Sequence, residues 1–295
     1  MTQSQNSSNG PALCVLGCGT MGVAILDGLF ATIDSSSSSS AATFVPSTVS
    51  ACVKSAGSQQ SLRDHFGSRV EVHASDEDNA AAATHADIIL LACKPQVAQT
   101  LLSNQAMQSA VAGKLVISIC AGVTLTQLRE WTSEGTRVVR AMPNTPSKIR
   151  EGMCVIACPP DTSETDKSYA TSIFAPLGRC RILDEKHMDA VTGLSGSGPA
   201  FACVVLESLA DGGVMMGLPR DAAIELAAQT LQGAARMVLQ TGQHPAAIKD
   251  AVTTPAGCTI AGLLTMEDGK IRSTLARAVQ EAASVASRLG QPPSK

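Results

Sequence analysis

The chain has 295 residues, which is enough for about two domains. Hydrophobic residues make up 44% of it and aromatic residues only 2%, so we expect a sizeable aliphatic core. The net charge of −3 gives no basis for binding nucleic acid or an anionic membrane. No uninterrupted apolar run approaches the roughly 20 residues of a transmembrane helix. We therefore expect a globular protein that binds neither nucleic acid nor a membrane.

Strands and helices alternate through the first part of the chain. The predicted strands occupy residues 12–16, 49–53, 70–73, 88–92, 115–119, 138–141, 154–158 and 181–183. Helical patterns lie at 23–29, 59–66 and 79–85, and the run Ser35–Ser40 reads as a surface insertion of no assigned role. Because the strands are continuous apolar runs, this order predicts a doubly wound, mainly parallel α/β sheet.

Only helices are predicted after Asp184. They cover residues 199–216, 219–238, 245–252, 259–266 and 271–289. The first of these is apolar on all sides, which predicts burial all round and a second chain to provide part of it. We therefore expect a Rossmann-like domain at 11–184, followed by an all-helical domain at 185–290 for dimerisation and substrate binding.

Two features of the sequence indicate the cellular compartment: the first ten residues and the ten cysteines. Met1 to Gly10 lacks the apolar segment of a signal peptide and the arginines of a transit peptide. The cysteines are scattered, form no CxxC, and have no histidine near them at zinc-ligand spacing. This pattern predicts reduced, mostly buried thiols in a cytoplasmic protein without a metal site.

A glycine-rich loop follows the first strand and opens the first helix. Its sequence is Gly17-Cys18-Gly19-Thr20-Met21-Gly22. In this position the GxGxxG pattern predicts a dinucleotide site, with Gly17 making the turn, Gly19 admitting the pyrophosphate and Gly22 allowing close helix packing. The alternative is a glycine-rich turn that binds nothing.

The end of the second strand bears on the choice between NAD and NADP. An NAD enzyme places a carboxylate there, whereas this chain has Cys52-Val53-Lys54-Ser55. Lys54 and Ser55 are suited to a 2′-phosphate, so we predict NADPH as cofactor, with NADH possible. The alternative for Lys54 is an ordinary solvated lysine.

A second loop with a ligand pattern precedes the helix predicted at 259–266. Its sequence is Thr253-Thr254-Pro255-Ala256-Gly257-Cys258-Thr259. A helix amino terminus offers free N–H groups and a positive dipole end, and Gly257 admits an anion close to the backbone. We therefore predict a carboxylate site here; the alternative is that Thr259 is simply a helix cap.

These motifs together resemble the pyrroline-5-carboxylate reductase family, in the right order over nearly the whole chain. Besides the glycine-rich loop, the matching blocks are Ala92-Cys93-Lys94-Pro95-Gln96, Ser118-Ile119-Cys120-Ala121-Gly122-Val123, Met142-Pro143-Asn144-Thr145-Pro146, Leu194-Ser195-Gly196-Ser197-Gly198-Pro199-Ala200 and His244-Pro245 through Thr259. The last two blocks are specific, whereas the glycine-rich loop is shared by many dehydrogenases. The serine run is atypical of the family, and Thr253-Thr254 stands where serines are frequent.

The resemblance implies NAD(P)H-dependent reduction of 1-pyrroline-5-carboxylate to L-proline, the last step of proline biosynthesis. It also implies a homodimer, with decamers possible. By the same resemblance Thr254, Gly257, Cys258 and Thr259 hold the substrate carboxylate, and Thr259 approaches the imine nitrogen as the catalytic residue. The residues implied for the cofactor groove are Asn79, Ala92, Lys94, Pro95, Ala121 and Asn144.

Two other functions stay open at this point. One is a two-domain NADP-dependent 3-hydroxyacid dehydrogenase, whose lysine base would here have to be Lys186. The other is a non-catalytic NADPH sensor. An electrophilic imine needs orientation more than an acid, so neither His187 nor His244 is assigned a role. Glu207 and Asp211 read as a solvated or subunit-interface stripe rather than a paired-carboxylate site.

Overall fold

The computed structural model describes residues 10–35 and 44–289, which fall into two compact units. One unit holds the described chain up to Gly196 together with the end of the last helix from Ala282. The other is Ser197–Glu281. Most of the predicted serine insertion, residues 36–40, lies outside the described part. Ser35 itself ends the first helix.

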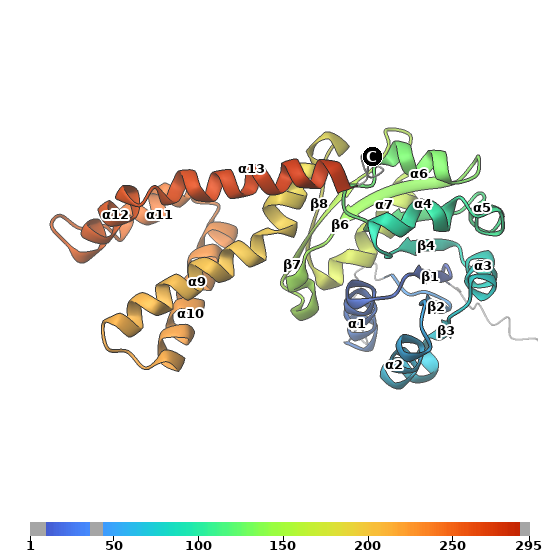
Figure 1. Cartoon of the computed structure of the whole chain (residues 1–295), viewed down its shortest axis with the longest axis horizontal. Helices are drawn as coiled ribbons and strands as arrows, with labels where there is room; N and C mark the ends of the chain where they lie inside the picture. The colour runs from blue at the N-terminus through green and yellow to red at the C-terminus, as the bar shows by residue number, and fades with distance from the viewer. Residues whose placement is uncertain (1–9, 36–43, 290–295) are drawn as a thin grey trace, which may run out of the picture. The chain divides into compact units, whose positions relative to one another are not determined.

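An eight-stranded sheet forms the centre of the first unit (Figure 1). Its strands are β1 (Leu13–Leu16), β2 (Val49–Cys52), β3 (Glu71–His73), β4 (Ile88–Leu91), β5 (Leu115–Ser118), β6 (Arg137–Met142), β7 (Gly152–Ala157) and β8 (Gly178–Ile182). Their order is β3-β2-β1-β4-β5-β6-β7-β8, and every neighbouring pair is parallel except β6–β7. The predicted α/β class with a mainly parallel sheet is confirmed.

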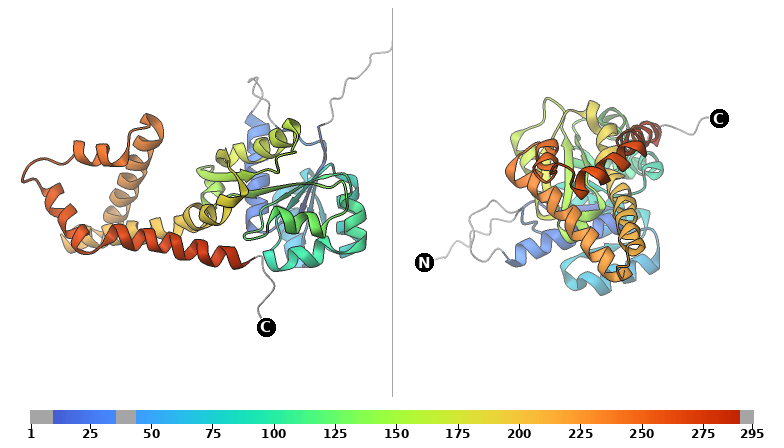
Figure 2. Two further views of the ribbon diagram at one scale, coloured as in Figure 1. Left: turned by 90° about the horizontal axis from the view of Figure 1, so that it is seen from above. Right: turned by 90° about the vertical axis from the view of Figure 1, so that its left-hand side faces the viewer.

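Helices cover both faces of this sheet (Figure 2). Leu13 and Val15 of β1 belong to the same buried cluster as side chains of α1 (Thr20–Ser35), α2 (Ala56–Phe66) and α7 (Glu164–Phe174). The alternate residues Cys14 and Leu16 join the opposite cluster, with α3 (Asp76–His85), α4 (Pro95–Leu102), α5 (Gln105–Val111) and α6 (Leu125–Trp131). The alternation of side chains along each strand thus divides the core into two layers.

The order of the strands defines a switch point between β1 and β4. The chain runs from β1 outward to β2 and β3, and then returns to place β4 on the other side of β1. In doubly wound sheets, ligands bind at the carboxyl ends of the strands where this reversal occurs. The loop that begins at Gly17 follows β1 directly, so it lies at this point.

Short helical turns connect the later elements. They are η1 (Gly67–Arg69), η2 (Thr145–Ile149), η3 (Ala175–Leu177), η4 (Glu185–His187), α8 (Met188–Val191) and a π-helical turn, η5 (Thr192–Gly196). Arg140 of β6 is 3% exposed and forms ion pairs with Glu185 at 3.4 Å and Asp189 at 3.7 Å. The Glu185 carboxylate also accepts the Leu125 N–H at 2.6 Å. This buried arginine therefore fixes the segment that leaves the sheet.

Only helices follow β8 in the described chain, as predicted, and the second unit begins at Ser197. Its helices are α9 (Gly198–Met215), α10 (Arg220–Thr241), α11 (Pro245–Ala251), α12 (Cys258–Asp268) and α13 (Ile271–Leu289), the last of which continues into the first unit. Its buried core consists of the small side chains of Ala210, Ala223 and Ala227. A side-chain carbon on Gly213 would lie 3.3 Å from that of Ala223, so α9 and α10 approach closely.

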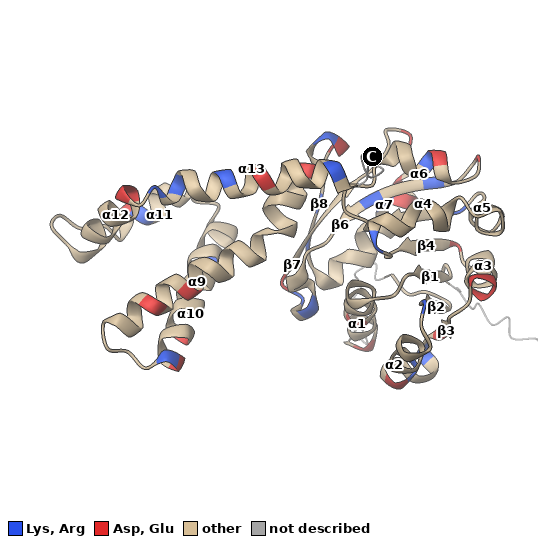
Figure 3. Cartoon of the chain, viewed as in Figure 1, with Lys and Arg blue, Asp and Glu red and all other residues tan. Residues whose placement is uncertain are grey.

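Most large apolar side chains of the second unit are exposed in the single chain. Val204 is 62% exposed, Met215 86% and Leu226 56%. Figure 3 shows few charged residues along α9. Ala210 is the only buried residue of α9 among those described, so the rest of the burial predicted for this helix would have to come from a second chain.

One helical stretch of the described chain, Glu185–Met215, is long and apolar enough to cross a membrane, with a mean hydropathy of 1.2. Charged residues such as Glu207 and Asp211 interrupt this stretch, so the sequence shows no single apolar run of about 20 residues here. Length and composition alone do not distinguish a spanning helix from one covered by protein.

Candidate active site

Backbone geometry makes Gly17 the turn residue of the glycine-rich loop. Its φ of 80° lies in the left-handed region, which favours glycine. A side-chain carbon at this position would lie 2.6 Å from the Cα of Cys93, which follows β4. The N–H groups of Gly17 and Cys18 both donate to the Cys52 carbonyl at 2.9 Å. The loop therefore lies tightly between the ends of β2 and β4.

The next two glycines differ in what surrounds them. A side-chain carbon on Gly22 would meet the Cys18 Sγ at 3.0 Å and the Val15 Cγ1 at 3.2 Å, so α1 packs closely on β1. At Gly19 the nearest atom would be the Gly17 carbonyl oxygen at 4.0 Å, and the residue is exposed. Open space beside the first N–H groups of α1, including those of Thr20 and Met21, suits a pyrophosphate.

A cavity of about 510 Å³ lies beside this loop and brings three of the predicted cofactor residues together. Gly17, Lys54 and Asn79 line it, with Cys93 and Asp76. The Asn79 Oδ1 is buried without a hydrogen-bond partner. Because a buried acceptor without a donor is costly, this atom suits a hydroxyl or amino donor of a bound ligand. The residues present therefore fit a dinucleotide.

Ser55 and a second cavity lie around the amino terminus of α2. The Ser55 hydroxyl caps that helix by accepting the Ser58 N–H at 3.2 Å, and it donates to the Ser58 Oγ at 2.9 Å. A cavity of about 660 Å³ is lined by Gly19, Thr20, Ser58 and Lys148. Ser58 and Lys148 were not predicted from the sequence. The Asn144-Thr145-Pro146 block just before Lys148 was the available signal.

Four other predicted cofactor residues lie just beyond the carboxyl ends of β4 and β5. The Ala92 N–H donates to the Leu16 carbonyl at 2.8 Å, beside the end of β1. Lys94 is the N-cap residue of α4, Pro95 occupies its first turn, and Ala121 follows β5. These positions share the sheet edge of the glycine-rich loop but are not among the residues that line the two cavities.

Asn144 has three hydrogen bonds within the first unit. Its Nδ2 donates to the carbonyl of Ser195 at 3.1 Å and to the Ser195 Oγ at 3.3 Å, and its Oδ1 accepts the Met153 N–H at 2.9 Å. Ser195 belongs to the π-helical turn, a geometry frequent at functional sites. Asn144 therefore holds this turn in place. The family resemblance also implies it for the cofactor groove.

The loop from Thr253 to Thr259, predicted to bind a carboxylate, leaves the amino terminus of α12 without a side-chain cap. Gly257 is the N-cap residue, and no side chain bonds the end of the helix. A side-chain carbon on Gly257 would lie 2.5 Å from the Thr254 Oγ1, so only glycine fits against Thr254. The helix begins at Cys258, one residue before the prediction, which places Thr259 inside the first turn and not at the cap.

Three residues weighed in the sequence but outside the candidate site, His244, Asp211 and Lys186, have ordinary partners. His244 caps α11 through its Nδ1, which accepts the Ala246 N–H at 3.2 Å, as expected for a helix entry. Asp211 forms an ion pair with Arg220. Lys186 is 71% exposed and lies 3.3 Å from Asp184. A solvated, paired lysine does not provide the buried base that a 3-hydroxyacid dehydrogenase requires.

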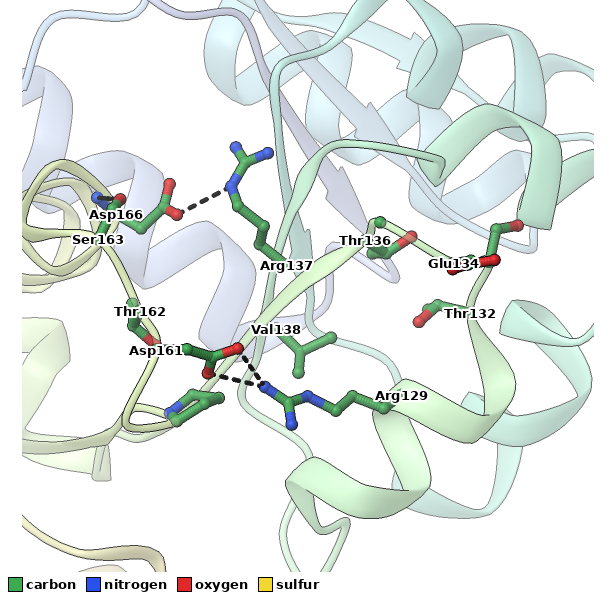
Figure 4. A pocket seen from close by; sticks show the side chains of 13 residues that line it. Arg129, Thr132, Glu134, Thr136, Arg137, Val138, Asp161, Thr162, Ser163 and Asp166 are labelled. Carbon is green, nitrogen blue, oxygen red and sulfur yellow. Dashed lines mark hydrogen bonds and ion pairs between the residues drawn. The ribbon is translucent and has the colours of Figure 1, made fainter.

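A further cavity, of about 440 Å³, lies at the amino-terminal end of β6 (Figure 4). Two ion pairs cross it: Arg129–Asp161 at 3.0 Å and Arg137–Asp166 at 2.8 Å. Because these charges are paired and lie at the edge of β6 away from the strand ends that carry the glycine-rich loop, we assign this cavity no part in the site.

The fold and the glycine-rich loop define a Rossmann-type oxidoreductase. A family model described as "NADP oxidoreductase coenzyme F420-dependent" matches residues 12–122, and one described as "Pyrroline-5-carboxylate reductase dimerisation" matches residues 185–289. The pyrroline-5-carboxylate reductase of Schizosaccharomyces pombe is 49% identical over 94% of this chain and 99% of its own length. The chain belongs to the pyrroline-5-carboxylate reductase family.

Solved structures agree with this assignment. The Plasmodium falciparum pyrroline carboxylate reductase with NADP bound has a TM-score of 0.80 at 29% identity, covering 95% of this chain and 98% of the other. The Coxiella burnetii pyrroline-5-carboxylate reductase has a TM-score of 0.81 at 28% identity, covering 96% and 100%.

Proposed function

We propose that this protein reduces 1-pyrroline-5-carboxylate to L-proline with NADPH, and less readily with NADH, as the last step of proline biosynthesis. The observation that carries the proposal is the glycine-capped end of α12, in a chain whose family is named for a carboxylate substrate. Its free N–H groups have no competing side-chain cap, so they are available to a carboxylate. The solvated Lys186 argues against the hydroxyacid alternative.

The chain's own residues act by binding and orientation. Bound NADPH supplies the hydride. The N–H groups of Cys258 and Thr259, with the Thr254 hydroxyl, hold the carboxylate and so fix the ring of the imine. The Thr259 hydroxyl hydrogen-bonds the ring nitrogen and so fixes the orientation of the C=N bond. Positioning of this kind contributes much of the acceleration when the imine is already protonated and electrophilic.

The preference for NADPH is expected to depend on Lys54, which lines the cavity beside Gly17. Lys54→Asp places a negative charge where a 2′-phosphate would bind, so it should raise the KM for NADPH by roughly tenfold or more, while the KM for NADH changes little. Steady-state kinetics with both cofactors test this. Lys186→Asp, at an exposed lysine outside the cavity, is the matched control. Equal effects of Lys54→Asp on both cofactors would make it an ordinary surface lysine.

We also propose a homodimer formed through the helical unit, with decamers as a further stage, and a cytoplasmic location. The dimer is supported by the small alanine core, the exposed apolar side chains and the match to a dimerisation model. The location is supported by ten cysteines that are all free thiols. Light scattering at assay concentration should give a mass of at least two chains. A stable, active monomer would contradict the dimer.

Absorbance of NADPH in the presence of purified protein and 1-pyrroline-5-carboxylate tests the proposed reaction directly. We expect the absorbance to fall and proline to form in equal amount. A 3-hydroxyacid in the presence of NADP+ is the comparison substrate for the hydroxyacid alternative. Binding of NADPH without turnover of either substrate would favour the sensor and refute the reductase.

A further inference from the structure

Two thiols lie side by side at the carboxyl ends of β4 and β5. The sulfur atoms of Cys93 and Cys120 are 4.0 Å apart. Leu91 and Ser118 are register partners, and the Ile119 N–H continues the ladder to the Leu91 carbonyl at 2.9 Å. Two residues further along, Cys93 faces Cys120.

The pair is accessible from the cofactor cavity through one of its members. Cys93 lines that cavity and is partly exposed, whereas Cys120 is 2% exposed. The Cys120 Sγ lies 3.3 Å from the Cys93 carbonyl oxygen. The hydrogen bond between the two thiols lowers the pKa of Cys120, whereas this bond and burial raise the pKa of Cys93.

Cys93 is also in direct contact with the glycine-rich loop. Its Cα lies 2.6 Å, and its Cβ 2.7 Å, from where a side chain on Gly17 would begin. Joining the two sulfurs requires them to approach from 4.0 Å to about 2.05 Å. Because the backbone of Cys93 is packed against the turn at Gly17, that movement acts on the surface proposed to hold the pyrophosphate.

We propose that Cys93 and Cys120 form a peroxide-sensitive dithiol whose oxidation weakens NADPH binding. This inference rests on the cofactor site of the function proposed above. Hydrogen peroxide is the oxidant. The Cys93 sulfur attacks one peroxide oxygen, the O–O bond breaks, and the departing hydroxide leaves with the thiol proton as water. The Cys120 sulfur then attacks the resulting sulfenic acid, forming the S–S bond and releasing a second water.

Other close thiols show why this pair is distinct. Cys14 and Cys52 are 3.8 Å apart but 0% and 1% exposed, and they are diagonal in the ladder, because Cys14 pairs with Ser50. Cys154 and Cys180 are register partners in β7 and β8, away from the glycine-rich loop. Because Cys154 and Cys180 do not contact the glycine-rich loop, their oxidation should not affect cofactor binding.

The test compares reduced and peroxide-treated full-length protein, with excess peroxide removed by catalase. NADPH affinity is measured by fluorescence titration, so that the result does not depend on the substrate. The disulfide is detected by mass spectrometry, since trypsin leaves Cys93 in peptide 70–114 and Cys120 in peptide 115–129, each as its only cysteine. After peroxide treatment we expect these two peptides to be linked. The Kd for NADPH should rise by roughly tenfold, a common size for such coupling. Dithiothreitol should reverse both changes.

Cysteine variants, and protection of the thiols by bound NADP+, complete the experiment. Cys120→Ala and Cys93→Ser, each compared with its own untreated form, should lose the response to peroxide, whereas Cys180→Ala should keep it. Bound NADP+ should slow formation of the link, because coupling is reciprocal. A link without a change in Kd, or no link when other thiols are oxidised, would overturn the proposal. Reduced protein that fails to bind NADPH would instead refute the cofactor site.

Discussion

Thr259→Ala is expected to lower kcat/KM for 1-pyrroline-5-carboxylate by roughly tenfold to a hundredfold, with a loss in both kcat and substrate affinity. A hydrogen bond to a charged group is worth roughly 1.5–3 kcal/mol, and the proposed bond to the imine adds an effect on turnover. Thr259→Ser keeps the hydroxyl and should be mild. Steady-state kinetics on both variants, with NADPH affinity measured separately, give the comparison.

Thermal melting separates this role from simple helix capping. Because the cap of α12 is Gly257 and Thr259 lies inside the first turn, Thr259→Ala should leave Tm nearly unchanged. A capping residue would show the opposite pattern, with lower Tm and near-normal kinetics. Unchanged kcat/KM in Thr259→Ala would mean that the substrate binds elsewhere.

Alanine at Gly17 and at Gly19 should affect different properties of the protein. Gly17→Ala puts a side chain into the backbone of Cys93 at a φ of 80°, so it should destabilise the fold. Backbone strain alone costs about 1–3 kcal/mol, and each kcal/mol lowers Tm by about 2–4 °C in a chain of this size. Gly19→Ala meets no protein atom closer than 4.0 Å, so Tm should stay the same.

Gly19→Ala should weaken NADPH binding without lowering Tm. An added methyl group in a closely packed contact costs about 1–3 kcal/mol, which corresponds to roughly a tenfold to hundredfold rise in the Kd for NADPH. Calorimetric melting and fluorescence titration of both variants provide the measurements. If Gly19→Ala bound NADPH normally, the pyrophosphate could not lie against this residue, and the loop would be a turn without a ligand.

The sheet was predictable because buried parallel strands are continuous apolar runs that hydrophobic composition reveals. The apolar run in β7 says nothing of strand direction, so its antiparallel pairing with β6 could not be predicted. Helices α4, α5, α6 and α7 were missed. The first three have only eight, seven and seven residues, which give too little periodicity.

The candidate site was predictable where function follows from a contiguous motif. Gly17 and Gly257 belong to short local patterns. Gly17 has the positive φ that its turn requires, and Gly257 has no room for a side chain beside Thr254. Lys148 reaches the cavity beside Gly19 from a distant segment, and Asn144 bonds Ser195 across the fold. Contacts of this kind depend on tertiary packing, which local sequence does not encode.

The alanine-only core of the helical unit has a consequence for how the protein is made. The sheet unit has two extensive aliphatic layers and can complete its folding within one chain. The helical unit lacks such a core, so in the proposed dimer it would gain most of its burial only when another chain arrives. We therefore expect assembly in two kinetic stages, a first whose rate is independent of protein concentration and a second that is bimolecular and slows on dilution. Newly synthesised chains would spend the interval between these stages with an apolar helical surface open to chaperones and to aggregation.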